Sequence, residues 1–218
     1  NKYNSFVELL ADIKNKTSVN SRQLEILTGL NFFSEFGKNK YLLNIIQVYD
    51  KFSSCKQINK SKLDSLGISE YIAKKHSKKE TASLFKEIDN IGLITNLCQG
   101  LENIEMGIIE MVKFEKEHLD MVVYTNDKVG NNYYIIVDYK TYKDTSKPYF
   151  IARKIKTGEE IHSKIKQGKI FKENPFGLYS VLKINSFTPT PKTKFIDGKW
   201  QKTDEMEDVL TDYEVIKN

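Results

Sequence analysis

The densest group of side chains that could do chemistry lies between Glu115 and Asp120, where three carboxylates and one histidine occur within six residues. Such groups act together in catalysis or metal binding only if they converge on one point. Adjacent residues on a helix point in different directions, so Glu115 and Glu117 cannot meet at one metal or substrate. We interpret the segment as a solvated helix face and predict no catalytic residue in it.

Other signatures of catalysis or metal binding are missing from the sequence. It has no Walker A loop, no Gly-rich dinucleotide fingerprint, no zinc-protease helix motif and no nucleophile elbow. Its two cysteines, Cys55 and Cys98, are far apart, and no histidine lies at metal-ligand spacing from either. We therefore predict reduced, buried thiols, no metal site and no cofactor.

Binding of a polyanion is better supported, because cations and rings accumulate late in the chain. Residues 139–202 hold 15 basic and five acidic residues, a net charge of +10, whereas residues 1–130 carry only +1. Phosphates need such a cationic surface, and a base stacked on an exposed ring contributes roughly 1–3 kcal/mol. The candidate nucleic-acid-binding residues are Lys147, Tyr149, Arg153, Lys164, Lys166, Lys169, Lys172, Lys192 and Lys194.

Most rings in this region are expected to fill a core rather than face solvent. The aromatic residues interleaved with the cations are Tyr139, Tyr142, Tyr149, Phe150, Tyr179 and Trp200. The acidic tail, residues 203–216, carries a net charge of −6, so the positive field is assigned to the segment before it.

The elements that must position these residues change type near residue 130. Apolar residues recur at helical spacing from Phe6 to Ile13, and all four prolines lie after residue 147. We predict a helical domain over residues 1–125, with weaker helices at 61–66, 69–75, 81–88 and 91–97 and a clearer one at 104–121. Residues 126–132 form a turn-rich linker.

From Tyr133 the apolar period becomes about 2, and β-branched and aromatic residues dominate. Strands are predicted at 133–142, 148–156, 160–166, 178–187 and 193–196, with a short one near 213–216. Gly158 supplies a hairpin turn after the second strand. Five short strands with a longer link between the third and fourth favour an OB-fold-like β-barrel over residues 131–218, although another small barrel or an open sheet fits too. The predicted fold class is α+β.

Composition sets the broad class. With 39% hydrophobic and 29% charged residues the chain is expected to fold, and no apolar run is long enough to span a membrane. The absence of a signal pattern predicts a cytoplasmic protein. A helical pattern that already runs by Phe6, without an initiator Met, suggests a piece of a longer polypeptide.

Several short patches, in this order and spacing, resemble the alpha subunit of bacterial DNA polymerase III, the C-family replicase. Residues 5–10, 19–27 and 33–40 are similar to the helices after that family's tandem helix-hairpin-helix element, with Asn31, Ser34 and Lys40 in place of its usual Gly, Asp and Arg. Residues 113–119 resemble the segment that leads into its OB domain, and residues 147–150 and 157–159 resemble that domain's first two turns.

This resemblance implies a non-catalytic region of a DNA-directed DNA polymerase, a nucleotidyltransferase, because the family's catalytic aspartates precede it. Its partners would be single-stranded DNA and the rest of the polymerase chain, and no membrane. The family's internal clamp-binding pentapeptide would fall at residues 80–85, where Leu84 and Phe85 match its end but its glutamine is missing. The sliding clamp is therefore a further candidate partner.

The leading hypothesis is that a basic OB barrel binds single-stranded template DNA. The alternative is a replisome protein-interaction module that docks the sliding clamp through Leu84 and Phe85. A third hypothesis, a stand-alone nucleic-acid enzyme with a diverged site, would require nuclease or polymerase activity. The sequence does not distinguish DNA from RNA as the ligand.

Overall fold

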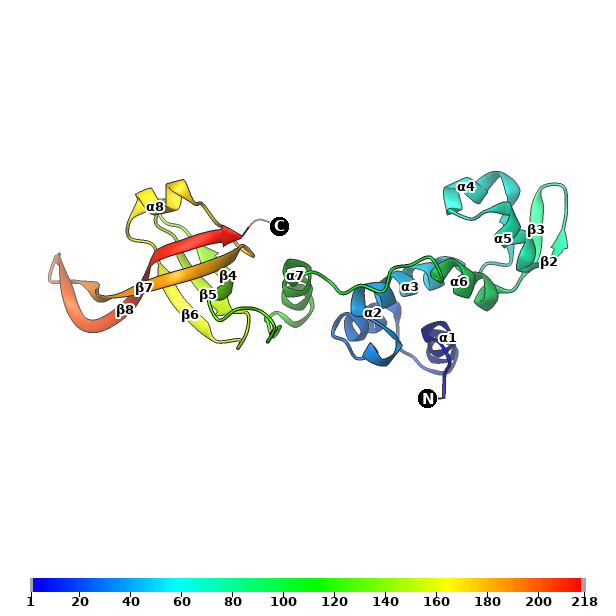
Figure 1. Ribbon diagram of the computed structural model, residues 1–218, viewed down its shortest axis with the longest axis horizontal. Helices are drawn as coiled ribbons and strands as arrows, with labels where there is room; N and C mark the ends of the chain where they lie inside the picture. The colour runs from blue at the N-terminus through cyan, green and yellow to red at the C-terminus, as the bar shows by residue number, and fades with distance from the viewer. Residues whose placement is uncertain (1, 217–218) are drawn as a thin grey trace. The chain divides into compact units, whose positions relative to one another are not determined.

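The chain has a mixed α+β fold with two compact units, which divide between Met106 and Gly107 (Figure 1). The computed structural model describes residues 2–216. We call the part before the division unit 1 and the part after it unit 2. The predicted boundary near residues 126–132 is wrong, because the helix before this linker packs within unit 2 rather than unit 1.

Four helices of unit 1 share one hydrophobic core, and their starts follow from the sequence. The Ser5 side chain accepts a hydrogen bond from the Glu8 amide, and Asn20 forms a capping box with Gln23. After the second helix, Asn31 adopts a left-handed φ of 64°, which asparagine tolerates better than most residues. These helices are α1 (Phe6–Lys16), α2 (Ser21–Gly29), α3 (Asn39–Phe52) and α6 (Asn90–Cys98), with η1 (Ser34–Phe36) between α2 and α3.

Between α3 and α6 the chain forms a small sheet that the sequence pattern did not predict. The predicted helix at 81–88 is wrong, because Leu84–Ile88 is the central strand of a three-stranded sheet in the order β1-β3-β2. Thr81 closes the hairpin, since its hydroxyl accepts a hydrogen bond from the Leu84 amide at 3.0 Å. The elements are β1 (Gln57–Asn59), η2 (Lys60–Lys62), α4 (Leu63–Leu66), α5 (Glu70–Lys75), β2 (Ser77–Glu80) and β3 (Leu84–Ile88).

Unit 2 is built on a five-stranded sheet that closes on itself in the order β4-β5-β6-β8-β7 (Figure 1). β7 pairs with β4 to complete the ring, and every pairing is antiparallel except that of β6 with β8. Its elements are α7 (Ile108–Leu119), β4 (Tyr133–Lys140), β5 (Tyr149–Lys154), β6 (Glu160–Lys164), α8 (Gly168–Glu173), β7 (Val181–Ile196) and β8 (Lys199–Ile216).

Helix α7 belongs to unit 2 because its apolar face packs against the outside of the closed sheet. Val112 is fully buried in a cluster with Ile135 and Ile155. Glu115 is only 3% exposed, and one of its carboxylate oxygens accepts hydrogen bonds from the amides of Val123 and Tyr124 at 2.8 and 2.7 Å. The interpretation of this residue as part of a solvated face is therefore wrong, because Glu115 fixes the chain that leaves the helix.

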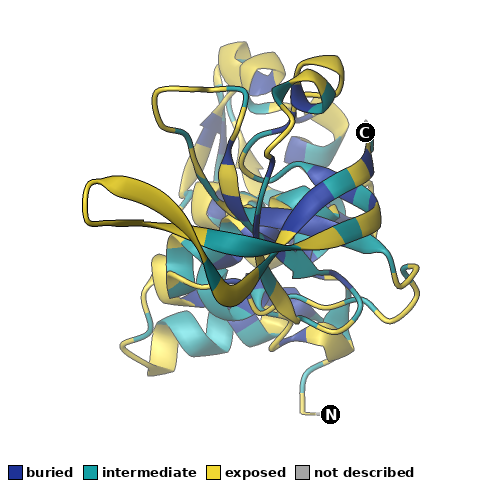
Figure 2. Cartoon of the chain, turned by 90° about the vertical axis from the view of Figure 1, so that its left-hand side faces the viewer, coloured by how far each residue is buried: buried dark blue, intermediate teal, exposed yellow. Residues whose placement is uncertain are grey.

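The last two strands form one long hairpin rather than the short separate strands predicted at 193–196 and 213–216. β7 and β8 pair from Val181 and Ile216 to a two-residue turn, where Asp197 and Gly198 have φ values of 50° and 77°. Two consecutive left-handed residues match the right-handed twist of the flanking strands. Figure 2 shows the far half of this hairpin as mostly exposed. We call residues 190–207 the arm.

Candidate nucleic-acid interface

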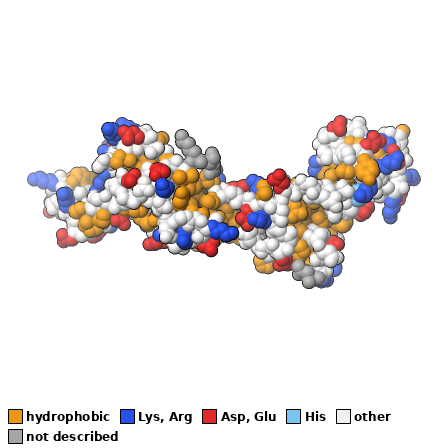
Figure 3. Space-filling view, viewed as in Figure 1, with side chains coloured by type: hydrophobic (Ala, Val, Ile, Leu, Met, Phe, Trp, Pro, Cys, Tyr) orange, Lys and Arg blue, Asp and Glu red, His pale blue; other side chains and the backbone are white. Residues whose placement is uncertain are grey.

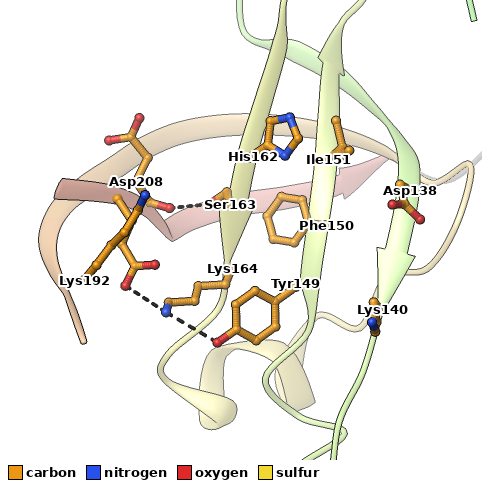
Figure 4. Close-up of a pocket in the computed structure, with 11 residues that line it drawn as sticks. Asp138, Lys140, Tyr149, Phe150, Ile151, His162, Ser163, Lys164, Lys192 and Asp208 are labelled. Atoms are coloured by element: carbon orange, nitrogen blue, oxygen red, sulfur yellow. Dashed lines mark hydrogen bonds and ion pairs between the residues drawn. The ribbon is translucent and has the colours of Figure 1, made fainter. Parts of the chain in front are cut away.

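The outer face of the closed sheet has a pocket of about 380 Å³ where β4, β5 and β6 adjoin the base of the arm. Figure 4 shows Tyr149 on β5 and Lys164 on β6 beside each other, and Lys192 of the arm lines the same pocket. The period-2 alternation of β6 explains this placement, because Ser163 is buried while Lys164 points outward. Three of the predicted binding residues therefore line one pocket: Tyr149, Lys164 and Lys192.

Two exposed tyrosines lie at the β4–β5 side of this pocket. Tyr142 is 58% exposed and Tyr149 44%, and their rings meet edge to face with centroids 5.3 Å apart. Lys140 lies 5.1 Å from the centre of the Tyr142 ring, and Lys164 lies 5.1 Å from the centre of the Tyr149 ring. The pair thus presents aromatic surface with a cation beside each ring, which suits an unstacked base and its phosphate.

The loop that carries Tyr142 is held by a short network of polar contacts. Asp144 accepts hydrogen bonds from the Ser146 hydroxyl at 2.6 Å and amide at 3.1 Å, and it forms an ion pair with Lys147 at 2.9 Å. The hydrogen bonds from Ser146, followed by the Lys147 contact, lower the pKa of Asp144 to about 2. Lys147, a predicted phosphate ligand, therefore stabilises its own loop and has an acidic partner.

Glu207 of β8 forms ion pairs with two predicted phosphate ligands, Lys164 and Lys166. The Glu207 carboxylate lies 2.7 Å from the Lys164 ammonium and 3.2 Å from that of Lys166. Burial works to raise the pKa of Glu207, but the contacts with Lys164 and Lys166 outweigh it and hold the pKa below its usual value. The carboxylate is thus charged at neutral pH and neutralises part of the cationic face.

Glu205 of the arm likewise neutralises predicted phosphate ligands. Glu205 lies 3.3 Å from Lys192 and 2.7 Å from Lys194. The contact with Lys194 has the larger effect, and both contacts lower the pKa of Glu205. The assignment of the positive field to residues 139–202 alone is therefore wrong. Because β8 lies between β6 and β7, folding returns the negative charge of residues 203–216 to the same surface.

The remaining predicted ligands lie away from the pocket. Arg153 sits at the other end of β5, where its largely buried side chain covers the Gly158 turn and pairs with Glu160 at 3.2 Å. Lys169 and Lys172 are on α8, outside the residues that line the pocket. The structure therefore does not gather the nine predicted residues into one strip.

The arm carries a ring pair whose placement sequence reasoning missed. Phe195 and Trp200 pair across the strands at its tip with ring centroids 5.5 Å apart, and Trp200 is 72% exposed. The signal that could have found them is the Asp197-Gly198 dipeptide, a strong hairpin marker between two aromatic-containing runs.

Of the two predicted clamp-binding residues, Phe85 is not accessible to a partner. Phe85 is 0% exposed in the core of unit 1, and Leu84 is half-buried beside it in β3. The Lys60 ammonium lies 4.8 Å from the centre of the Phe85 ring. A docking peptide must insert such side chains into its partner, so the burial of Phe85 argues against this use of the pair, whereas Leu84 is partly exposed.

Both cysteines are free thiols, and burial raises the pKa of Cys98 to about 11. Residues 2–216 contain no group of three or more His, Cys, Asp or Glu side chains arranged to hold a metal ion. Among the helices of the described chain, none has the length and apolar character that a membrane span requires. No family model, curated protein or solved structure matches this chain.

Proposed function

We propose that unit 2 is an OB-fold barrel that binds single-stranded DNA without catalysing a reaction on it. Its strands follow the order first, second, third, fifth, fourth around the ring, and the third runs parallel to the fifth. OB folds bind oligonucleotides on the face of strands 2 and 3 and with the loops between strands 1 and 2 and between strands 4 and 5. The pocket, the Tyr142 loop and the arm occupy those three places.

The observation that carries this proposal is the exposed ring pair of Tyr142 and Tyr149 beside Lys140 and Lys164. Each base that stacks on an exposed ring gains roughly 1–3 kcal/mol, whatever its identity. In duplex DNA the bases are already stacked on one another and unavailable to these rings. The proposed ligand is therefore a single strand, bound without sequence readout.

The charge arrangement sets the expected salt dependence. Lys140 is the one pocket cation with no ion pair to a carboxylate among the described residues, whereas Lys164 and Lys192 each contact an acid. If about two phosphates are neutralised, the log–log slope of affinity against salt should be roughly −1.4. A fully free strip of five cations would give roughly −3.5. Stacking thus contributes more of the affinity than the sequence composition predicts.

The test is a fluorescence anisotropy titration of the full chain with a labelled thymidine oligonucleotide at low salt. Tyr149→Ala should raise the Kd by roughly tenfold, within the range of one lost stacking contact. Tyr71→Ala removes a tyrosine of unit 1 that is 75% exposed, more than the 44% of Tyr149, and should leave the Kd unchanged. Equal affinities of the wild type and the Tyr149 variant would overturn the proposal.

The wider setting is proposed from the residue patches that resemble the C-family replicase. In that setting the chain would be a non-catalytic, cytoplasmic part of a DNA polymerase, and its barrel would hold the template strand. Docking on the sliding clamp gains no support from the geometry, because Phe85 is inside the core and Leu84 is half-buried.

A further inference from the structure

Unit 1 carries a second concentration of positive charge, around its three-stranded sheet. Residues 51–88 hold nine lysines and four acidic residues, a net charge of +5, which equals the net charge of the whole chain. Figure 3 shows Lys and Arg side chains gathered over β2 and β3. The net charge of +1 for residues 1–130 as a whole therefore conceals a strongly positive segment within them.

Three of these lysines line one open pocket of about 470 Å³: Lys56, Lys79 and Lys86. The strand register places Lys79 of β2 directly opposite Lys86 of β3, and Gln57 of β1 opposite Lys86 on its other side. Directly opposite residues of antiparallel strands share a face, and their Cβ atoms lie about 5 Å apart. The sheet therefore presents an amide and two ammonium groups in a row, with Lys56 next to them.

These lysines differ from Lys164 and Lys192 of the unit 2 pocket in having no acidic partner among the described residues. Among the described residues, no carboxylate forms an ion pair with Lys56, Lys79 or Lys86. The nearby Glu80 is already held by Lys60 at 2.6 Å. Like charges directly opposite each other destabilise a sheet, so a bound anion would relieve a repulsion that the fold leaves uncompensated.

We propose that this pocket binds phosphate groups of a nucleic-acid backbone. Glu87 is the one carboxylate that lines it, which leaves a formal charge of +2. No aromatic side chain lines it, so it offers no stacking surface and should accept duplex and single strands alike. A membrane surface is the less favoured polyanion, because its binding also needs exposed apolar anchors and the pocket has only the half-buried Ile88.

This site lies in the other unit from the proposed OB barrel and uses different chemistry, so one proposal can fail while the other stands. The test is anisotropy of the full chain with a labelled 20-base-pair duplex across a salt series. Lys79→Gln together with Lys86→Gln should raise the Kd about tenfold, at roughly threefold per lost phosphate contact, and reduce the log–log salt slope by about 2. Tyr149→Ala should leave duplex binding unchanged.

The matched control is Lys62→Gln with Lys75→Gln, which removes two exposed lysines of the same segment outside the pocket. It should change the Kd by less than about twofold. An equal loss of duplex affinity in the two double variants would show that binding depends on the general positive charge of the segment, and it would overturn the proposed site. An unchanged affinity of the pocket variant would also overturn it. Pocket-dependent binding to phosphatidylserine vesicles without an effect on the duplex would also overturn it. A thermal unfolding midpoint at or above that of the wild type confirms that the pocket variant is folded.

Discussion

The proposed binding of single-stranded DNA by unit 2 predicts that Glu207 limits the affinity, because Glu207 forms ion pairs with lysines that a phosphate would contact. Its carboxylate lies 2.7 Å from Lys164 and 3.2 Å from Lys166. A phosphate that contacted the same lysines at about 4 Å from the Glu207 carboxylate would be repelled by about 1 kcal/mol in water. Glu207→Gln removes this repulsion and should lower the Kd for single-stranded DNA about fivefold.

The same substitution should steepen the salt dependence. Each additional phosphate contact adds about −0.7 to the log–log slope for a single strand, so two released lysines add up to about −1.4. The assay is anisotropy of wild type and Glu207→Gln with one labelled oligonucleotide at several salt concentrations. Weaker binding by the variant at every salt concentration would refute the reasoning, because it would mean that Glu207 positions Lys164 for the ligand.

Folding must be measured beside binding, because Glu207 and Lys164 are both largely buried. The pKa of Glu207 is lowered in the folded chain, so its carboxylate stabilises the fold above the usual glutamate pKa of 4.5, and this contribution is lost as the pH falls through the lowered value. Glu207→Gln should therefore have a flatter dependence of unfolding free energy on pH below about 5. An unchanged pH dependence would contradict the pairing.

Three further predictions concern residues whose roles the fold defines. Glu115→Ala leaves the amides of Val123 and Tyr124 without their charged acceptor and should lower the unfolding free energy by about 3 kcal/mol, whereas Glu117→Ala on the same helix should change it little; denaturant unfolding measures both. Phe85→Ala should cost about 3–5 kcal/mol as a core truncation, and an unchanged stability would reopen clamp docking through this residue. Trp200 is the single tryptophan, so its emission should be quenched when a strand reaches the arm, and a signal that stays constant through saturation would exclude the arm tip from the interface.

The sequence predicted well the elements whose signals are local. The helical spacing from Phe6 to Ile13 lies within α1, and the Gly158 turn joins β5 to β6 with a φ of 77°. The apolar period of about 2 continues through β6 to Ile165 just after it, where Ser163 and Ile165 are buried and Lys164 lies between them on the other face. These features depend on a few neighbouring residues, whose conformational preferences act without the rest of the fold.

Features that depend on distant pairing were missed. In the acidic segment at 203–216 the sequence pattern indicated a strand only near 213–216, yet the segment pairs with β7 along its length and with β6 at Asp208 and Val209. Summing charge along the sequence therefore overstated the cationic face. For the same reason the unpaired Lys79 and Lys86 were overlooked, because only the strand register places them opposite each other.

The most direct measurement of the central claim is photo-cross-linking of the full chain to an oligonucleotide that contains 5-iododeoxyuridine, followed by mass spectrometry of the peptides. A base stacked on the ring pair should cross-link to Tyr142 or Tyr149. Cross-links confined to unit 1, or their absence from residues 141–154 at saturating oligonucleotide, would contradict the account.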